Sequence, residues 1–111
     1  MWSLPDWARA FDVCIMPYHK DAFSANANPL KLREYLATGK PVVSVPIPVL
    51  KEFSECVETA GEPREFLEKM DRAMAEDPEK KRRRMDLVAP MSWEARVHCI
   101  LEVVEKRLAE L

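Results

Sequence analysis

Glycine is scarce in this 111-residue sequence and occurs only at Gly39 and Gly61. A dinucleotide fingerprint of the Gly-x-Gly-x-x-Gly type needs three closely spaced glycines, and a P-loop needs two at a fixed short spacing. The chain contains neither motif. If it binds a nucleotide, it does so without a glycine-rich phosphate loop.

Cysteine and histidine are also few, with three of the former and two of the latter. Cys14, Cys56 and Cys99 lie far apart in apolar stretches, so we interpret them as small buried hydrophobic residues. No Cys-x-x-Cys spacing accompanies His19 and His98, which makes a structural zinc site improbable on spacing alone. We expect no bound metal.

Charge and hydropathy argue against nucleic-acid-binding and membrane-spanning classes of protein. The net charge is -2, from 17 basic and 19 acidic residues, so neither nucleic acid nor an anionic membrane is expected as a partner. The basic run at 79–85 (EKKRRRM) suggests nucleic-acid binding by itself, but acidic residues surround it, and a solvated helix face is the preferred interpretation. No apolar run approaches the roughly 18 residues of a membrane span, and no signal pattern begins the chain. We expect a cytoplasmic protein without a transmembrane segment.

The order of elements predicts an α/β fold in a single domain over residues 1–111. Short apolar runs at 13–16 and 42–45 are typical of strands buried on both faces, and 56–60 is a weaker third strand. Helices are expected between and after them, which favours a small parallel sheet of about three strands with flanking helices. So small a sheet leaves a long edge exposed, and part of a larger sheet is then absent or supplied by a partner.

Helical segments are expected at 5–11, 29–38, 62–76, 79–87 and from Ser92 onward. Ser92 is a favoured cap for the long last helix, whose apolar stripe is more often core than a partner surface. The stripe contains Trp93, Val97, Ile100, Leu101, Val104 and Leu108. Near the other end, Trp2 and Trp7 have little preceding chain to bury them, so self-association through that side is a hypothesis.

The stretch at 26–46 (NANPLKLREYLATGKPVVSVP) has the features of an anion-binding helix start. Asn28 is a favoured N-cap, Pro29 suits the first helical position, and a glycine ends the helix. The free N–H groups of Leu30 and Lys31 point toward any anion placed at the tip. Glu34, one turn further on, can accept two ribose hydroxyl hydrogens. Together these groups are suited to a nucleotide, although a solvated Lys–Glu pair has the same spacing.

A long loop at 18–28 precedes this helix, at the carboxyl edge of the sheet where ligands of open α/β sheets bind. His19 in the loop is a possible contact to the sugar or phosphate of a ligand. An ordinary surface histidine is the alternative for this residue. The chain contains no nucleophile–base pair and no spaced carboxylates that define a catalytic site, so no catalytic residue is assigned.

The same stretch resembles the donor-site segment of the GT-B-fold glycosyltransferases of the retaining, group-1 kind, which reads approximately Pro-x-Lys-x-x-Glu-Tyr-Leu-Ala-x-Gly-Lys-Pro-Val-Val. The matching residues are Pro29, Lys31, Glu34, Tyr35, Leu36, Ala37, Gly39, Lys40, Pro41, Val42 and Val43. The FDVCIMPY strand, the ETAGEPREFLEKM segment and the SWEARV helix start follow the family's order. The resemblance implies a partial Rossmann-like, three-layer domain that corresponds to the later part of the family's carboxyl-terminal, donor-binding domain.

The resemblance also implies roles for individual residues. Glu34 corresponds to the second glutamate of the family's paired-glutamate motif, which holds the nucleotide ribose, and the amides of Leu30 and Lys31 approach the diphosphate. The position of the first glutamate, which contacts the sugar in many members, is Asn26 here, so the sugar contact lacks a carboxylate. Asn28 completes the donor site that we expect.

The implied function is binding of a nucleoside-diphosphate sugar for transfer to an acceptor held by an amino-terminal domain that this chain lacks. The sugar nucleotide is a substrate, and no cofactor is expected. Without an acceptor domain we do not expect sugar transfer by the chain alone; its partners are the missing domain or a partner chain, or a second copy. The alternative is a non-enzymatic interaction or oligomerisation module, and a phosphate-binding regulatory domain is a third hypothesis.

Overall fold

A three-stranded parallel sheet organises the protein, which we describe from a computed structural model covering residues 3–111. The strands β1 (Cys14–Met16), β2 (Val42–Ser44) and β3 (Glu58–Thr59) pair in the order β1-β2-β3. The expected α/β class and small parallel sheet are thereby confirmed. Each strand is short because proline or a turn follows it within a few residues, and proline cannot donate to a sheet ladder.

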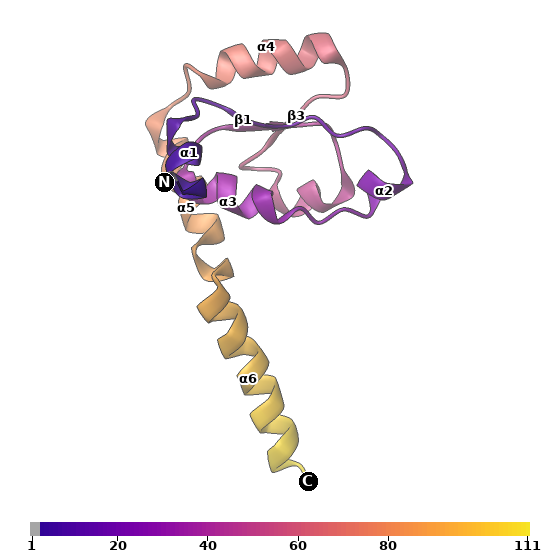
Figure 1. Cartoon of the computed structure of the whole chain (residues 1–111), viewed down its shortest axis with the longest axis vertical. Helices are drawn as coiled ribbons and strands as arrows, with labels where there is room; N and C mark the ends of the chain where they lie inside the picture. Colours follow the sequence, from indigo (N-terminus) through magenta and orange to yellow (C-terminus); the bar gives the residue numbers. More distant parts are fainter. Residues whose placement is uncertain (1–2) are drawn as a thin grey trace.

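Helices cover both faces of the sheet. Figure 1 shows α4 on one side and α3 with η1 on the other, so the body has three layers. The helical elements are α1 (Leu4–Ala10), α2 (Ala22–Ala25), α3 (Leu30–Thr38), η1 (Pro48–Phe53), α4 (Pro63–Ala73), α5 (Pro78–Val88), η2 (Ala89–Met91) and α6 (Trp93–Ala109). The strands run toward α2, which places the loops after β1, β2 and β3 at one edge of the sheet (Figure 1).

The core lies between the sheet and α3. Met16, Leu32, Leu36 and Phe53 are almost completely buried there. On the other face of β1, Ile15 stays 37% exposed, because α4 packs on β2 rather than on the edge strand. The prediction that this first strand is buried on both faces is therefore wrong.

The ends of α3 are close to the prediction. Gly39 ends the helix with a φ of 77°, and its N–H donates to the Leu36 carbonyl. At the start, Pro29 rather than Asn28 occupies the N-cap. The shift arises because the Asn28 side-chain oxygen accepts from Arg33 Nη1 at 2.9 Å instead of capping a backbone N–H. The loop before it also differs from expectation, since residues 22–25 form the one-turn helix α2.

The last helix begins as predicted and packs differently. The Ser92 hydroxyl accepts from the Ala95 N–H at 3.1 Å, and α6 then projects away from the body (Figure 1). Its apolar stripe is exposed, from 46% at Val104 to 73% at Trp93. The interpretation of this stripe as core is wrong, because no described element lies against it.

The three cysteines differ in burial. Cys14 is buried in the sheet, Cys56 is half-buried and Cys99 is exposed on α6, so the expected burial fails for the last. Burial raises the pKa of Cys14 to about 11 and raises that of Cys56 as well. At the amino terminus Trp7 is 55% exposed, while Trp2 lies outside the described residues.

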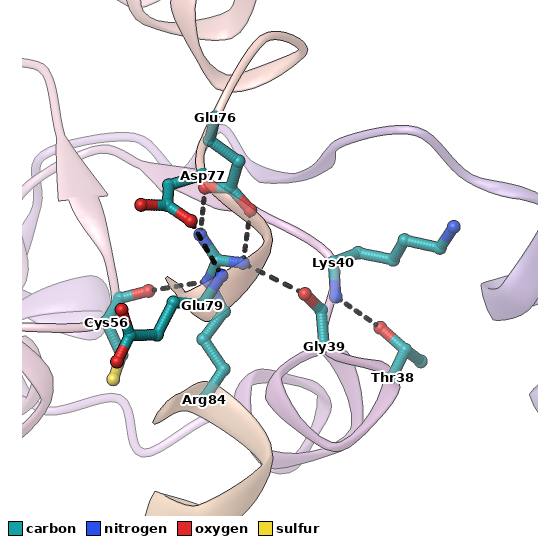
Figure 2. Close-up of polar contacts among 8 residues, drawn as sticks. All are labelled: Thr38, Gly39, Lys40, Cys56, Glu76, Asp77, Glu79 and Arg84. Atoms are coloured by element: carbon teal, nitrogen blue, oxygen red, sulfur yellow. Dashed lines mark hydrogen bonds and ion pairs between the residues drawn. The ribbon is translucent and has the colours of Figure 1, made fainter. Parts of the chain in front are cut away.

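A buried ion pair holds α5 to the sheet. Arg84 is 5% exposed and forms a bidentate pair with Glu76. Its guanidinium also donates to the carbonyls of Gly39, at 2.9 Å, and Cys56, at 3.4 Å (Figure 2). The solvated face predicted for 79–85 is therefore wrong at Arg84, because the chain reversal at Asp77 brings α5 back against the amino ends of β2 and β3.

Candidate functional site

The loop between β1 and α3 is ordered by local hydrogen bonds. Asp21 Oδ1 accepts from the Ser24 N–H at 2.8 Å, and the Ser24 hydroxyl donates to the His19 carbonyl. The bond from Ser24 holds the pKa of the Asp21 carboxyl below its usual range. Asn26 ends α2, and its side-chain amide donates to the Ala22 carbonyl at 2.8 Å. Side-chain caps therefore fix the shape of this connection.

The first turn of α3 has free donors. Because Pro29 begins the helix, the N–H groups of Leu30 and Lys31 have no backbone acceptor within residues 3–111, and such groups suit an anion. The Lys31 ammonium lies 4.8 Å from the centroid of the Tyr18 ring. This cation–π contact places Lys31 over the loop that follows β1.

A groove of about 770 Å³ runs along the outer face of α3. One wall includes Leu30, Arg33 and Glu34, and the opposite wall comes from the junction of α5 and α6, with Trp93 and Arg96. Binding sites for small ligands are typically about 300–1,000 Å³ in volume. The groove is therefore large enough for a nucleotide.

The Glu34 carboxylate is exposed in this groove. Within residues 3–111 it has no hydrogen bond or ion pair, and the pair with Lys31 that its spacing allows does not form. Both carboxylate oxygens are thus available to external hydroxyl donors.

Arg33 also lines the groove. Its Nη1 donates to Asn28 Oδ1 at 2.9 Å, and its guanidinium carbon lies 5.5 Å from the centroid of the Phe53 ring. Its Nε is buried without a hydrogen-bond partner in the described chain. Two contacts therefore fix the side chain before any ligand arrives. No sequence pattern marks Arg33, because the resembled segment leaves this position variable.

The structure brings together only part of the predicted site. Asn28, Leu30 and Glu34 line the groove. Lys31 lies over Tyr18 at the adjoining helix tip, and Asn26 is at the end of α2. His19 lines a separate hollow of about 600 Å³ on the α4 side of the sheet. The possible contact at His19 therefore lies apart from the groove.

A smaller hollow of about 180 Å³ lies at the amino edge of the sheet, near the Arg84 pair. Two of its basic side chains already have partners. Lys69 Nζ is 3.2 Å from the Glu65 carboxylate and also donates to the Thr59 carbonyl, while Arg84 is paired with Glu76. We interpret this hollow as structural.

Comparison with known proteins connects the chain to glycosyltransferases. Over 46 residues it is 41% identical to the "Putative teichuronic acid biosynthesis glycosyltransferase TuaH" of Bacillus subtilis (strain 168). The matched region covers 41% of this chain and 12% of that protein, so the chain spans only a small part of its relative. No known protein-family description and no solved structure matches the chain. The similarity supports a glycosyltransferase relationship.

Proposed function

We propose that the chain is the donor-binding part of a GT-B-type glycosyltransferase and that its α3 groove holds a nucleoside-diphosphate sugar. The observation that carries the proposal is that the unpaired Glu34 carboxylate lines the same groove as the Arg33 guanidinium, which Asn28 already holds in place. A carboxylate is suited to the vicinal diol of a ribose, and a guanidinium is suited to phosphate oxygens. Nucleotides carry both groups a few ångströms apart.

The diphosphate lies at the tip of α3 in this arrangement. The N–H groups of Leu30 and Lys31, the Lys31 ammonium and Arg33 contribute positive potential there. Hydrogen bonds to charged groups contribute about 1.5–3 kcal/mol each, so the Glu34 contacts are a large share of the affinity. We assign the sugar contact to Asn26, which ends the preceding α2. No metal or cofactor is required for binding.

The acceptor is held by a further domain or chain in this proposal. We assign the contact with that domain or chain to the apolar stripe of α6, because a continuous exposed patch of valine, isoleucine and leucine is typical of an interaction surface. Among residues 3–111, no helix is both long and apolar enough to cross a bilayer. We assign the reaction to the cytoplasm as part of this proposal.

A calorimetric titration tests the donor site. UDP, GDP, ADP and their sugar conjugates are titrated into wild type, Glu34→Ala and the control Glu52→Ala, which changes an exposed acid outside the groove. We expect Glu34→Ala to weaken the preferred nucleotide tenfold or more, about 1.4 kcal/mol, and the control to bind as wild type does. Equal affinity of the two variants, or no binding by folded wild-type protein, contradicts the proposal.

The exposed stripe also favours the second candidate function, a non-enzymatic interaction module that uses α6 and the open edge of β1. Sedimentation equilibrium distinguishes the two. A module that pairs with a second copy sediments as a dimer, and Val104→Lys, in the middle of the stripe, makes it monomeric. Nucleotide binding that survives in this monomeric variant assigns the groove to the first function.

A further inference from the structure

We propose that Trp93, in the first turn of α6, stacks on the nucleobase of the bound nucleotide. This inference rests on the proposed function and extends it to a wall of the groove that neither the resemblance nor the comparisons assign. Trp93 and Glu34 line the same groove from two different elements, α6 and α3. The base site would thus be made by the junction of α5 and α6.

The order of phosphate, ribose and base in a nucleotide determines how it would be oriented in the groove. Its phosphates leave the ribose at one end, its base leaves at the other, and the two hydroxyls lie between them. With the hydroxyls on Glu34 and the phosphates toward Leu30 and Arg33, the base is directed away from the tip of α3. The opposite wall, with Met85 and Trp93, is the surface that remains.

The surroundings of Trp93 fit a flat, weakly polar group. Its side chain is 73% exposed, and Met85 and Val88 continue the same wall. Arg96, one turn along α6, is also in the groove, and its guanidinium has no hydrogen bond or ion pair within residues 3–111. Every base has a face that stacks on an indole, and such contacts change affinity about 5- to 150-fold per base. Trp93 therefore contributes affinity without selecting the base.

The charge distribution supports this occupant over a purely apolar one. The groove is lined by a guanidinium held by Asn28, a carboxylate without a partner in the described chain and an exposed indole. An apolar protein segment laid in it would bury Glu34 without a hydrogen-bond donor, which is costly. A nucleoside diphosphate offers a partner to each of the three groups.

The test compares ligands with and without a base. UDP, GDP, ADP and inorganic pyrophosphate are titrated into wild type, Trp93→Ala, Trp93→Phe and the matched control Trp7→Ala, which replaces another half-exposed tryptophan. We expect Trp93→Ala to weaken the preferred nucleotide about tenfold and to leave pyrophosphate unchanged, and Trp93→Phe to keep most of the affinity. Nucleotide binding should also quench tryptophan fluorescence in Trp7→Ala and not in Trp93→Ala.

The outcomes separate this inference from the proposed function. Nucleotide affinity in Trp93→Ala equal to that in Trp7→Ala, while Glu34→Ala still weakens binding, overturns the stacking role and leaves the donor site intact. An equal loss for pyrophosphate and nucleotide also overturns it, because the effect is then on the shape of the groove. No nucleotide binding by folded wild-type protein overturns both. Urea denaturation of each variant establishes that it is folded.

Discussion

Replacing Arg84 by methionine should destabilise the protein strongly. The side chain is 5% exposed and contacts three partners: it forms a bidentate pair with Glu76 and donates to the carbonyls of Gly39 and Cys56 (Figure 2). Methionine preserves much of the volume and the helix propensity while it removes every donor. The measured loss therefore reports the polar contacts.

The magnitude follows from what is left without a partner. Breaking a buried ion pair from one side costs about 3–5 kcal/mol. The Glu76 side chain is 17% exposed and can turn toward water. The cost of breaking this ion pair is therefore at the lower end of that range. The Gly39 carbonyl loses a donor at a cost of about 1–3 kcal/mol, while the longer Cys56 contact contributes little. We expect a loss of about 4–6 kcal/mol in all, out of a typical total of about 5–15 kcal/mol.

Urea denaturation followed by circular dichroism measures this loss, with Arg83→Met as the matched control. Arg83 is the exposed neighbour on the same helix, so the same substitution there should change the free energy of unfolding by less than about 0.5 kcal/mol. The slope with urea should stay constant, which shows that the denatured state is unchanged. If Arg84→Met and Arg83→Met unfold at the same urea concentration, the cluster does not hold α5 to the sheet and the reasoning fails.

Three further predictions concern α3, the thiols and the loop after β1. Gly39→Ala should lower the free energy of unfolding by about 1–2 kcal/mol in urea titrations, because φ is 77° there and an alanine is strained; an unchanged midpoint would contradict this. In native protein at neutral pH a disulfide reagent should modify Cys99 first and Cys14 only after unfolding, because burial raises the pKa of Cys14 to about 11; mass mapping of the labelled sites decides it. The Asp21 carboxyl has a lowered pKa in the folded state. Its ionised form therefore stabilises the fold above the unfolded pKa near 3.8, and this stabilisation is lost as the pH falls through the pKa of the folded state. The amide NMR shift of its partner should report a midpoint below 3.8, and Asp21→Asn should abolish that titration.

The alternation of strands and helices could be predicted because each element has its own local signal. The two apolar runs before Pro17 and Pro46 have the length of short strands, and Gly39 marks the end of α3 through backbone geometry that other residues adopt only with strain. These signals depend on neighbours in sequence. They hold whatever else the chain packs against.

Burial could not be predicted in the same way, because it depends on what lies opposite. An amphipathic stripe indicates that one side of a helix avoids water, but it does not identify the covering element, and nothing described covers the stripe that includes Val97 and Leu101. The opposite error occurs at Arg84, which was predicted to be solvated and is buried. A run of basic residues looks solvated by composition, and only the turn at Asp77 places this one arginine against the sheet.

The residues of the candidate site also fall into those with a local sequence signal and those that depend on contacts between distant elements. Glu34 and the free N–H groups at the start of α3 could be found from spacing, since the helix alone places them. Arg33 depends on Phe53 from η1, and Trp93 depends on the angle at which α6 leaves the body. Both are contacts between elements distant in sequence, for which a single sequence has no local pattern.

In the described chain, the long helix α6 is attached to the body only near its first residues. Its 17 residues extend about 25 Å from a short attachment at η2, whereas the wall of the groove that contains Glu34 belongs to the rigid layer beneath the sheet. The opposite wall combines α5, which the Arg84 contacts hold to the body, with Trp93 of α6. A contact that changed the angle of α6 would move Trp93 relative to Glu34 and change the width of the groove. By thermodynamic reciprocity, a nucleotide that prefers one width then strengthens or weakens that distant contact by the same factor.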